Sequence, residues 1–370
     1  MIQVLIVDES VLERRLIKKA LEEDPEIGVA STAPNGLIAL RKVDQLDPDL
    51  ILLDINLPDM DGIDALRIMK NMRPKTPIIV FTAHNENAAA STIQALELGA
   101  ADFIEKPSGA RDFEESKSLI ARSLVPKIKA IHHQIQTPHI RIPAVQKGFE
   151  SLRPRSNTHI KPKHIDCVAI GVSTGGPDAL VKIFPSFPAD FPIPIVIVQH
   201  MPPLFTKNLA DRLDTISELD VKECRPGDVL YKGGAWVAAG GFHMTVRKAM
   251  GQVIISTSKD TPEVGCRPSV NVLFRSVARA FGANVLAVML TGMGKDGLEG
   301  SRHIVDAGGT LIAQDEASSV VWGMPGAVAR AGLTDTLIPL ARMGDEIVQR
   351  TARNTRSYTY QPEYNEAARF

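Results

Sequence analysis

The feature that most constrains the fold is a repeated pattern of short apolar runs, each followed at once by a polar residue. In the first third of the chain these runs cover residues 4–7, 50–53, 78–81 and 102–104, and helix-like segments separate them. Short apolar runs return in the second half, at residues 168–170, 193–199 and 285–290. Short buried strands that alternate with helices are typical of doubly wound parallel sheets. The sequence therefore predicts an α/β chain with two doubly wound, mostly parallel sheets.

Length and composition agree with two globular domains. The chain has 370 residues, of which 44% are hydrophobic and 23% charged, and its net charge is −1. These values give no general basis for nucleic-acid binding. The N-terminus enters a strand pattern directly and the apolar runs are too short to cross a bilayer, so we expect a cytoplasmic protein without direct membrane insertion. Cys167, Cys224 and Cys266 are widely spaced, which favours buried free thiols over a metal site or disulfides.

Carboxylates, a hydroxyl and an amine follow the runs of the first domain, at the edge where ligands bind in an open α/β sheet. They are Asp8, Glu9, Asp54, Thr82 and Lys106. The carboxylates can hold one Mg²⁺, and the most enclosed of them can then attack a phosphoryl group. Thr82 can bind the phosphoryl oxygens by a hydrogen bond and Lys106 by its charge. One such acid is usually a helix cap or a turn residue, but several compatible residues on successive strand ends favour a phosphoryl-accepting switch.

This region resembles the receiver domain of bacterial response regulators, a flavodoxin-like fold, over residues 1–122. The resemblance implies that Asp54 is the phosphoacceptor and that a histidine kinase is the phosphodonor. The implied Mg²⁺ site consists of Asp8, Glu9, Asp54 and the backbone carbonyl of Asn56. The implied phosphoryl switch consists of Thr82, Lys106 and Phe103, an aromatic side chain that changes rotamer on phosphorylation. The family more often has two aspartates where this chain has Asp8 and Glu9.

A tether is predicted between the two domains, over residues 123–164. Prolines beginning with Pro126 interrupt any long helix, and the basic residues face a single acid, Glu150. Because no aromatic residues are interleaved for stacking on bases, a solvated linker is favoured over a nucleic-acid arm. Residues 127–136 can instead continue a helix of the first domain. Residues 351–370 are predicted to be a disordered tail, with a short docking peptide as the alternative.

Three complementary side chains follow strands of the second domain, which we place at residues 165–350. Ser173 lies in a Gly-rich turn before a helix, His200 directly follows the run 193–199, and Asp296 lies in the loop after 285–290. A serine hydroxyl needs a base to become a good nucleophile. His200 can take its proton, while Asp296 fixes the imidazole tautomer and stabilises the imidazolium. The backbone N–H groups of Met293 and Thr174 can hold the developing oxyanion, so this pattern predicts a serine hydrolase.

Each of these side chains also has a structural interpretation. The turn at Ser173 can be a connector or a phosphate cradle, His200 can bond to backbone at a strand end, and Asp296 can cap a helix. The less specific candidates are His243 as an alternative base, Arg267 and Asn271 for substrate placement or helix capping, and Trp236 and Trp322 as core or rim residues.

Four blocks of the second domain resemble the chemotaxis protein-glutamate methylesterase family, the CheB family. They are GVSTGGP at 171–177, VQHMP at 198–202, LTGMGKDG at 290–297 and AQDEASSVVWGMPGAV at 313–328. The resemblance extends from residue 1 to about 350 and implies that Ser173, His200 and Asp296 form the triad. It also implies demethylation of glutamate methyl esters, and deamidation of glutamines, on chemoreceptor helices, without a cofactor for the esterase. The departures are Asn271 and Lys295, where acids are usual.

The order of the domains predicts how the hydrolase is regulated. An unphosphorylated receiver would pack over the Ser173 cleft, and phosphorylation of Asp54 would weaken that packing. Two alternatives stay open: a second domain that is a non-catalytic interaction module, and an esterase for small molecules. A DNA-binding output is disfavoured because nothing after residue 165 has the pattern of a helix-turn-helix.

Overall fold

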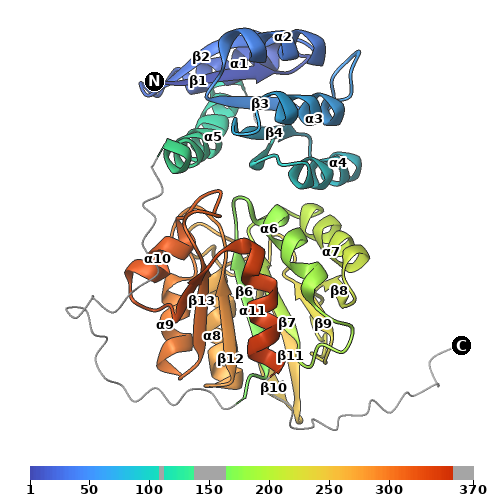
Figure 1. Ribbon diagram of the computed structural model, residues 1–370, viewed down its shortest axis with the longest axis vertical. Helices are drawn as coiled ribbons and strands as arrows, with labels where there is room; N and C mark the ends of the chain where they lie inside the picture. Colours follow the sequence, from blue (N-terminus) through green and yellow to red (C-terminus); the bar gives the residue numbers. More distant parts are fainter. Residues whose placement is uncertain (108–111, 137–163, 353–370) are drawn as a thin grey trace, which may run out of the picture.

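A computed structural model describes residues 1–107, 112–136 and 164–352, which form two α/β domains (Figure 1). None of the helices within these ranges has the length and apolar content needed to cross a membrane. The predicted linker after residue 136 and the predicted tail from residue 353 lie outside the described residues.

The N-terminal domain is built on a five-stranded parallel sheet with strand order β2-β1-β3-β4-β5. The strands are β1 (Ile2–Val7), β2 (Ile27–Ala33), β3 (Leu50–Asp54), β4 (Ile78–Thr82) and β5 (Asp102–Glu105). The helices are α1 (Val11–Leu21), α2 (Gly36–Leu46), α3 (Gly62–Met72), α4 (Glu86–Glu97) and α5 (Phe113–Gln136). Every residue of β3 and of β4 is buried, as expected for central parallel strands covered on both faces.

The apolar-run pattern found four of these strands and missed β2. This strand is an edge strand with the sequence IGVASTA, and its middle residues are only partly buried. An edge strand that is half exposed does not need a continuous apolar run, so its signal in the sequence is weak.

Helix α5 extends to Gln136, which places the predicted start of the tether, residue 123, inside a helix. Leu124, Ile128 and Ile131 are at most 1% exposed and belong to the core of the N-terminal domain. The helical spacing of these side chains outweighs the interruption expected at Pro126, which removes one hydrogen bond from within the helix. The alternative that residues 127–136 continue a helix of the first domain is therefore correct.

The C-terminal domain contains a seven-stranded parallel sheet with strand order β14-β13-β12-β6-β7-β9-β8. Its strands are β6 (Cys167–Val172), β7 (Ile195–Gln199), β8 (Asp220–Glu223), β9 (Gly234–Val237), β12 (Val285–Met289), β13 (Thr310–Gln314) and β14 (Thr336–Ile338). An antiparallel hairpin of β10 (His243–Ala249) and β11 (Gln252–Ser258) stands beside this sheet. The predicted α/β architecture with parallel sheets is confirmed in both domains.

Helices cover both faces of the second sheet. They are α6 (Gly176–Ile183), α7 (Phe205–Ile216), α8 (Val270–Phe281), α9 (Leu298–Asp306), α10 (Met324–Arg330) and α11 (Leu340–Ala352), with a short 3₁₀ turn at Phe184–Ser186. Buried residues of α6, α7 and α11 form one core cluster, and those of α8, α9 and α10 form another on the opposite face. In Figure 1, α4 and α5 are the parts of the N-terminal domain nearest to the second domain, with α4 on the side of α6 and α7 and α5 on the side of α10.

Candidate functional site

Three strand ends meet in the middle of the second sheet. Strand β6 lies between β7 and β12, and both pairings are parallel. Ser173 directly follows β6, His200 directly follows β7, and Asp296 lies in the loop after β12. Because the neighbouring strands are parallel, their carboxyl ends meet at one edge of the sheet, where α/β proteins bind ligands. The expectation that these residues project from one edge is therefore met by the topology.

The backbone around Ser173 is held by neighbouring loops. Its N–H donates to the carbonyl of Thr291 at 3.0 Å, and its carbonyl accepts from Gln199 Nε2 at 3.0 Å. The loop after β12 approaches so closely that a Cβ on Gly292 would lie 2.8 Å from the Cβ of Ser173. A glycine is required for this close approach, which brings the residues after Gly292 beside the serine.

His200 and Asp296 form a buried pair. His200 Nε2 is 2.8 Å from Asp296 Oδ2, and Asp296 is 2% exposed. The other donors to this carboxylate are Ser269 Oγ (2.9 Å) and the backbone N–H groups of Val270 (2.7 Å), Asn271 (3.2 Å) and Gly297 (2.9 Å). Burial alone would raise the pKa of Asp296, but the hydrogen bond and charge of His200 and the donors at the start of α8 lower it. The carboxylate is thus kept ionised beside the imidazole.

The second nitrogen of His200 faces a thiol. Its Nδ1 is 3.7 Å from Cys266 Sγ, whereas the Ser173 hydroxyl makes no hydrogen bond within the described part of the chain. Burial by itself lowers the pKa of His200, but its hydrogen bonds to Asp296 and Cys266 and their charges outweigh burial and raise the pKa to about 9. Since Nε2 is engaged by Asp296, Nδ1 is the nitrogen that remains for proton transfer.

All three cysteines are free thiols, as predicted, but the predicted burial is wrong for one of them. Cys167 and Cys224 are buried free thiols in the core, but Cys266 is partly exposed and lies against His200. The contact joins residues that are 66 positions apart, through a loop with no regular secondary structure, so no local sequence signal pointed to it.

The two predicted oxyanion residues flank the serine. Thr174 follows it in the chain and is 4% exposed, and Met293 follows Gly292. Within the described residues, the backbone N–H groups of Thr174 and Met293 have no acceptor. Two uncommitted donors beside a serine are what an oxyanion hole needs.

The less specific candidates have structural roles. His243 is 1% exposed and its Nε2 is 3.2 Å from the carbonyl of Thr261, in the loop that leads to Cys266. Arg267 donates to the carbonyls of Lys259 and Asp260 in the same loop, both at 3.0 Å. Asn271 Oδ1 accepts from the N–H of Gly300 at 2.7 Å, which supports its capping interpretation. Trp236 is fully buried, and the indole of Trp322 donates to the carbonyl of Gln314.

The first domain has a second polar site at the carboxyl ends of β1, β3, β4 and β5. Asp8 and Asp54 are buried, and Lys106 Nζ lies 2.9 Å from Asp8 Oδ2 and 2.6 Å from Asp54 Oδ2. Burial raises the pKa of Asp54, against the opposing effects of Lys106. Thr82 is buried at the end of β4, whereas Glu9 is exposed.

This pocket fits a hard divalent cation. Asp54 Oδ1 accepts from the N–H of Asn56 at 2.9 Å, so the backbone of Asn56 lies beside the phosphoacceptor predicted from the sequence. Carboxylate and carbonyl oxygens are the ligands that Mg²⁺ prefers, and Mg²⁺ keeps several waters. The exposed position of Glu9 makes it the one predicted ligand that has to turn inward.

The two domains contact each other beside Ser173. The ring of Phe103 stacks on Phe205 of α7, with centroids 4.6 Å apart. Thr174 Oγ1 donates to Asp102 Oδ2 at 2.9 Å, and Lys127 Nζ lies 2.7 Å from the same oxygen. The contact therefore reaches the residue that follows the candidate nucleophile.

Two further contacts extend the interface on either side. Glu97 of α4 and Arg212 of α7 form an ion pair at 2.5 Å. On the other side, Gln134 of α5 donates to the carbonyl of Glu316 and accepts from the N–H of Trp322, and Met293 packs against the apolar cluster that includes α5.

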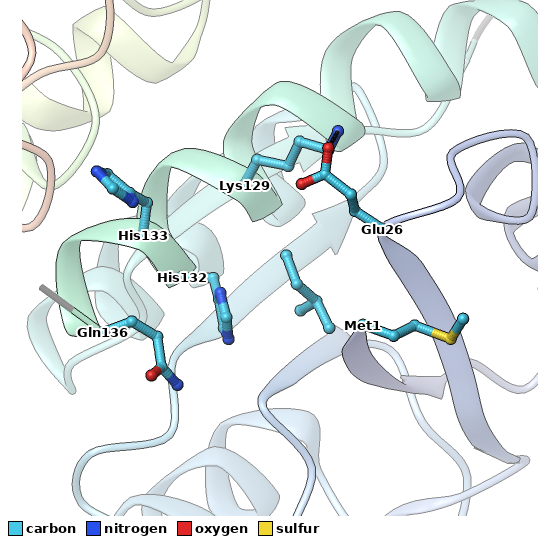
Figure 2. A pocket seen from close by; sticks show the side chains of 7 residues that line it. Met1, Glu26, Lys129, His132, His133 and Gln136 are labelled. Carbon is cyan, nitrogen blue, oxygen red and sulfur yellow. Dashed lines mark hydrogen bonds and ion pairs between the residues drawn. The ribbon is translucent and has the colours of Figure 1, made fainter.

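A hollow of about 470 Å³ lies elsewhere, between the start of β1 and the last turns of α5 (Figure 2). Its lining residues are Met1, Ile2, Glu26, Lys129, His132, His133 and Gln136. All of them belong to the first domain, and Lys129 is paired with Glu26 at 2.9 Å. The hollow is therefore separate from the edge that carries Ser173.

Comparison with known proteins gives a consistent result. Residues 168–347 match the family model described as CheB methylesterase, and residues 4–116 match the response regulator receiver domain. A protein-glutamate methylesterase/protein-glutamine glutaminase of Trichodesmium erythraeum is 44% identical over 350 residues, covering 94% of this chain and 98% of the relative. A protein of the same description from Pyrococcus horikoshii is 39% identical and covers 94% and 93%. The crystal structure of the Thermotoga maritima CheB methylesterase catalytic domain is 41% identical, covers 50% of this chain and 98% of that chain, and gives a TM-score of 0.49.

Proposed function

The chain belongs to the CheB methylesterase family and carries a response regulator receiver domain in front of the esterase domain, and we propose that it removes methyl groups from glutamate side chains of chemoreceptors under the control of phosphorylation at Asp54. The observation that carries the proposal is the meeting of Ser173, His200 and Asp296 at one sheet edge, with His200 and Asp296 2.8 Å apart. In this view the receiver extends through residue 136 and the esterase domain covers 165–350.

The reaction would proceed through an acyl-enzyme. His200 Nδ1 takes the proton of Ser173, and the serine oxygen attacks the carbonyl carbon of the glutamate methyl ester. The N–H groups of Thr174 and Met293 stabilise the oxyanion, worth about 3 kcal/mol per donor. The imidazolium then gives its proton to the departing methoxide, and methanol leaves. Water, activated by the same imidazole, releases the glutamate carboxylate and restores Ser173.

Deamidation follows the same steps with a glutamine side chain. The tetrahedral intermediate then expels ammonia in place of methanol, and the product is again a glutamate carboxylate. Asp296 keeps its role in both reactions because it stabilises the imidazolium, whichever leaving group receives the proton.

The receiver pocket supports phosphoryl transfer from a histidine kinase. Asp8, Asp54, the carbonyl of Asn56 and Glu9, once turned inward, would hold Mg²⁺, which offsets the negative charge of the phosphoryl group. The carboxylate of Asp54 is the nucleophile. Lys106, which already lies 2.6 Å from Asp54, and Thr82 would then bind the phosphoryl oxygens.

Control of the esterase rests on the domain contact. In the arrangement described here, Asp102 holds Thr174 and the receiver packs on Met293, so both proposed oxyanion residues lie under the first domain. Phe103 stacks on Phe205, so a change in its rotamer after phosphorylation would remove an aromatic contact. Phosphorylation thus shifts the population toward an arrangement in which the Ser173 edge is accessible.

The test is methanol release from methylated receptor, with and without a phosphodonor and Mg²⁺. Wild-type protein should release methanol faster with the phosphodonor, Asp54→Ala should not respond to it, and Ser173→Ala should release none. Activity that survives Ser173→Ala would support a non-catalytic second domain and an unrelated source of hydrolysis. Rapid turnover of simple esters without preference for receptor would instead support a small-molecule esterase.

A further inference from the structure

The partly exposed thiol beside His200 has no part in the proposed reaction. Cys266 Sγ lies 3.7 Å from His200 Nδ1, whereas Asp296 Oδ2 lies 2.8 Å from His200 Nε2. One ligand atom from each of His200, Cys266 and Asp296 lies within 4.8 Å of the others. No other three His, Cys, Asp or Glu side chains bring their ligand atoms this close together in the described ranges 1–107, 112–136 and 164–352.

The separation between Nδ1 and Sγ fits two ligands of one metal ion. Zinc binds imidazole nitrogen at about 2.0–2.1 Å and thiolate sulfur at about 2.3 Å in tetrahedral geometry. These bond lengths place the two ligand atoms about 3.6 Å apart. The observed 3.7 Å is therefore close to the separation that a shared zinc-like ion requires.

Asp296 is better suited to orient the imidazole than to bind the metal. Its oxygens already accept hydrogen bonds from Ser269, Val270, Asn271 and Gly297 as well as from His200. Metal-binding histidines commonly donate the other ring N–H to such a carboxylate. The hydrogen bond between His200 Nε2 and Asp296 thus leaves Nδ1, which lies 3.7 Å from Cys266 Sγ, unengaged by the carboxylate.

We propose that His200 Nδ1 and Cys266 Sγ form an inhibitory site for a thiophilic divalent cation of the Zn²⁺ class. On binding, the thiol loses its proton to solvent, sulfur and Nδ1 each donate a lone pair to the metal, and water completes the coordination. A metal-bound Nδ1 has no lone pair to accept the proton of Ser173, so ester hydrolysis stops. The inhibition, but not the binding, rests on the proposed function of His200.

The two proposed metal sites of the chain should prefer different cations because their ligand atoms differ. Soft thiolate and imidazole ligands favour zinc-like ions, whereas the receiver pocket offers carboxylate and carbonyl oxygens, which favour Mg²⁺. The other two thiols do not compete, because Cys167 and Cys224 are buried in the core. Burial raises the pKa of Cys224 to about 12, so this thiol resists the deprotonation that metal binding requires.

The test titrates the full-length chain with Cd²⁺, whose bond to a thiolate has its own ultraviolet absorption, and with Zn²⁺ in competition with a chromogenic chelator. Cys266→Ala should weaken binding at least tenfold and abolish the absorption band, whereas the matched control Cys224→Ala should change neither. Cys266→Ser and circular dichroism check that any loss is not due to unfolding.

Activity is measured in the same samples with Mg²⁺ present throughout. Zn²⁺ should inhibit methanol release by the wild type, a chelator should restore it, and Cys266→Ala should keep at least tenfold more of its own metal-free rate at the same Zn²⁺ concentration. Equal Cd²⁺ affinity of wild type and Cys266→Ala would overturn the proposal. If Cys266 is required for binding Cd²⁺ and Zn²⁺ but the wild-type protein hydrolyses no ester, the metal site is supported and the proposed function is overturned.

Discussion

Reversing the charge of Arg212 tests whether the domain contact restrains the esterase. Arg212 of α7 pairs with Glu97 of α4 at 2.5 Å, and their side chains are 39% and 20% exposed. Because the arginine is more than a third exposed, the pair is worth only about 0.5–1 kcal/mol. Arg212→Glu also adds a repulsion of similar size between like charges, so the contact is weakened by about 1–2 kcal/mol.

Before the change, most molecules have the receiver packed on the esterase domain. The free energy lost therefore corresponds to about a 5- to 30-fold increase in the fraction of molecules whose Ser173 edge is accessible. Methanol release by unphosphorylated Arg212→Glu should rise by that factor, and the rate with a phosphodonor should change little. The double variant Glu97→Arg with Arg212→Glu should restore the low basal rate. Arg302→Glu, which makes the same charge change on α9 and breaks only a pair within its own helix, is the control. An unchanged basal rate in a folded Arg212→Glu protein would refute the reasoning.

Four further predictions concern the site and the core. Because the pKa of His200 is raised to about 9, its neutral form should grow as pH rises, so kcat/KM in the presence of a chelator should increase about tenfold per pH unit from pH 7 and level off near the pKa. Cys266→Ala removes one cause of the raised pKa and should move this profile to lower pH; an unmoved profile would contradict that assignment. Asp296→Asn should lower kcat by about 10⁴-fold with little change in thermal stability of the receiver, measured by domain-resolved calorimetry. Ile128 of α5 is fully buried, so Ile128→Ala should destabilise the receiver by about 2–5 kcal/mol in urea unfolding, whereas truncation of a side chain in a true tether would have almost no effect.

The positions of Ser173, His200 and Asp296 could be predicted from the sequence because each lies directly after a short apolar strand or in the loop that follows one. In a parallel sheet the ends of neighbouring strands share one edge, so local patterns are enough to bring distant residues together. The same reasoning placed Asp8, Asp54, Thr82 and Lys106 in one pocket. It did not find β2, since an edge strand with small polar residues lacks the apolar run on which the pattern depends.

Contacts made by loops and by domain docking could not be predicted in this way. The thiol of Cys266 reaches His200 through an irregular loop, and Thr174 reaches Asp102 only because two separate domains pack together. Neither contact leaves a periodic signal in the chain. The end of α5 is a different case, because the sequence carries two opposing signals there: Pro126 predicts an interruption, while the apolar spacing of Leu124, Ile128 and Ile131 predicts a buried helical face, which is what forms.

The residue at position 271 is an amide, Asn271, so it adds no second negative charge beside Asp296, the carboxylate that pairs with His200. Its Oδ1 accepts from the N–H of Gly300 at 2.7 Å, and its backbone N–H donates to Asp296. Glu263 lies close by, and its pKa is lowered chiefly by its ion pair with Arg275, with a smaller contribution from a hydrogen bond with Asn271. Asn271→Asp would keep an oxygen acceptor for the N–H of Gly300 at the start of α9. It would also remove the amide that donates to Glu263 and place a negative charge beside Glu263 and Asp296. The added negative charge should raise the pKa of His200 further, so the pH profile of Asn271→Asp should move to higher pH, opposite to that of Cys266→Ala. A shift to lower pH would show that the amide acts through geometry and not through charge.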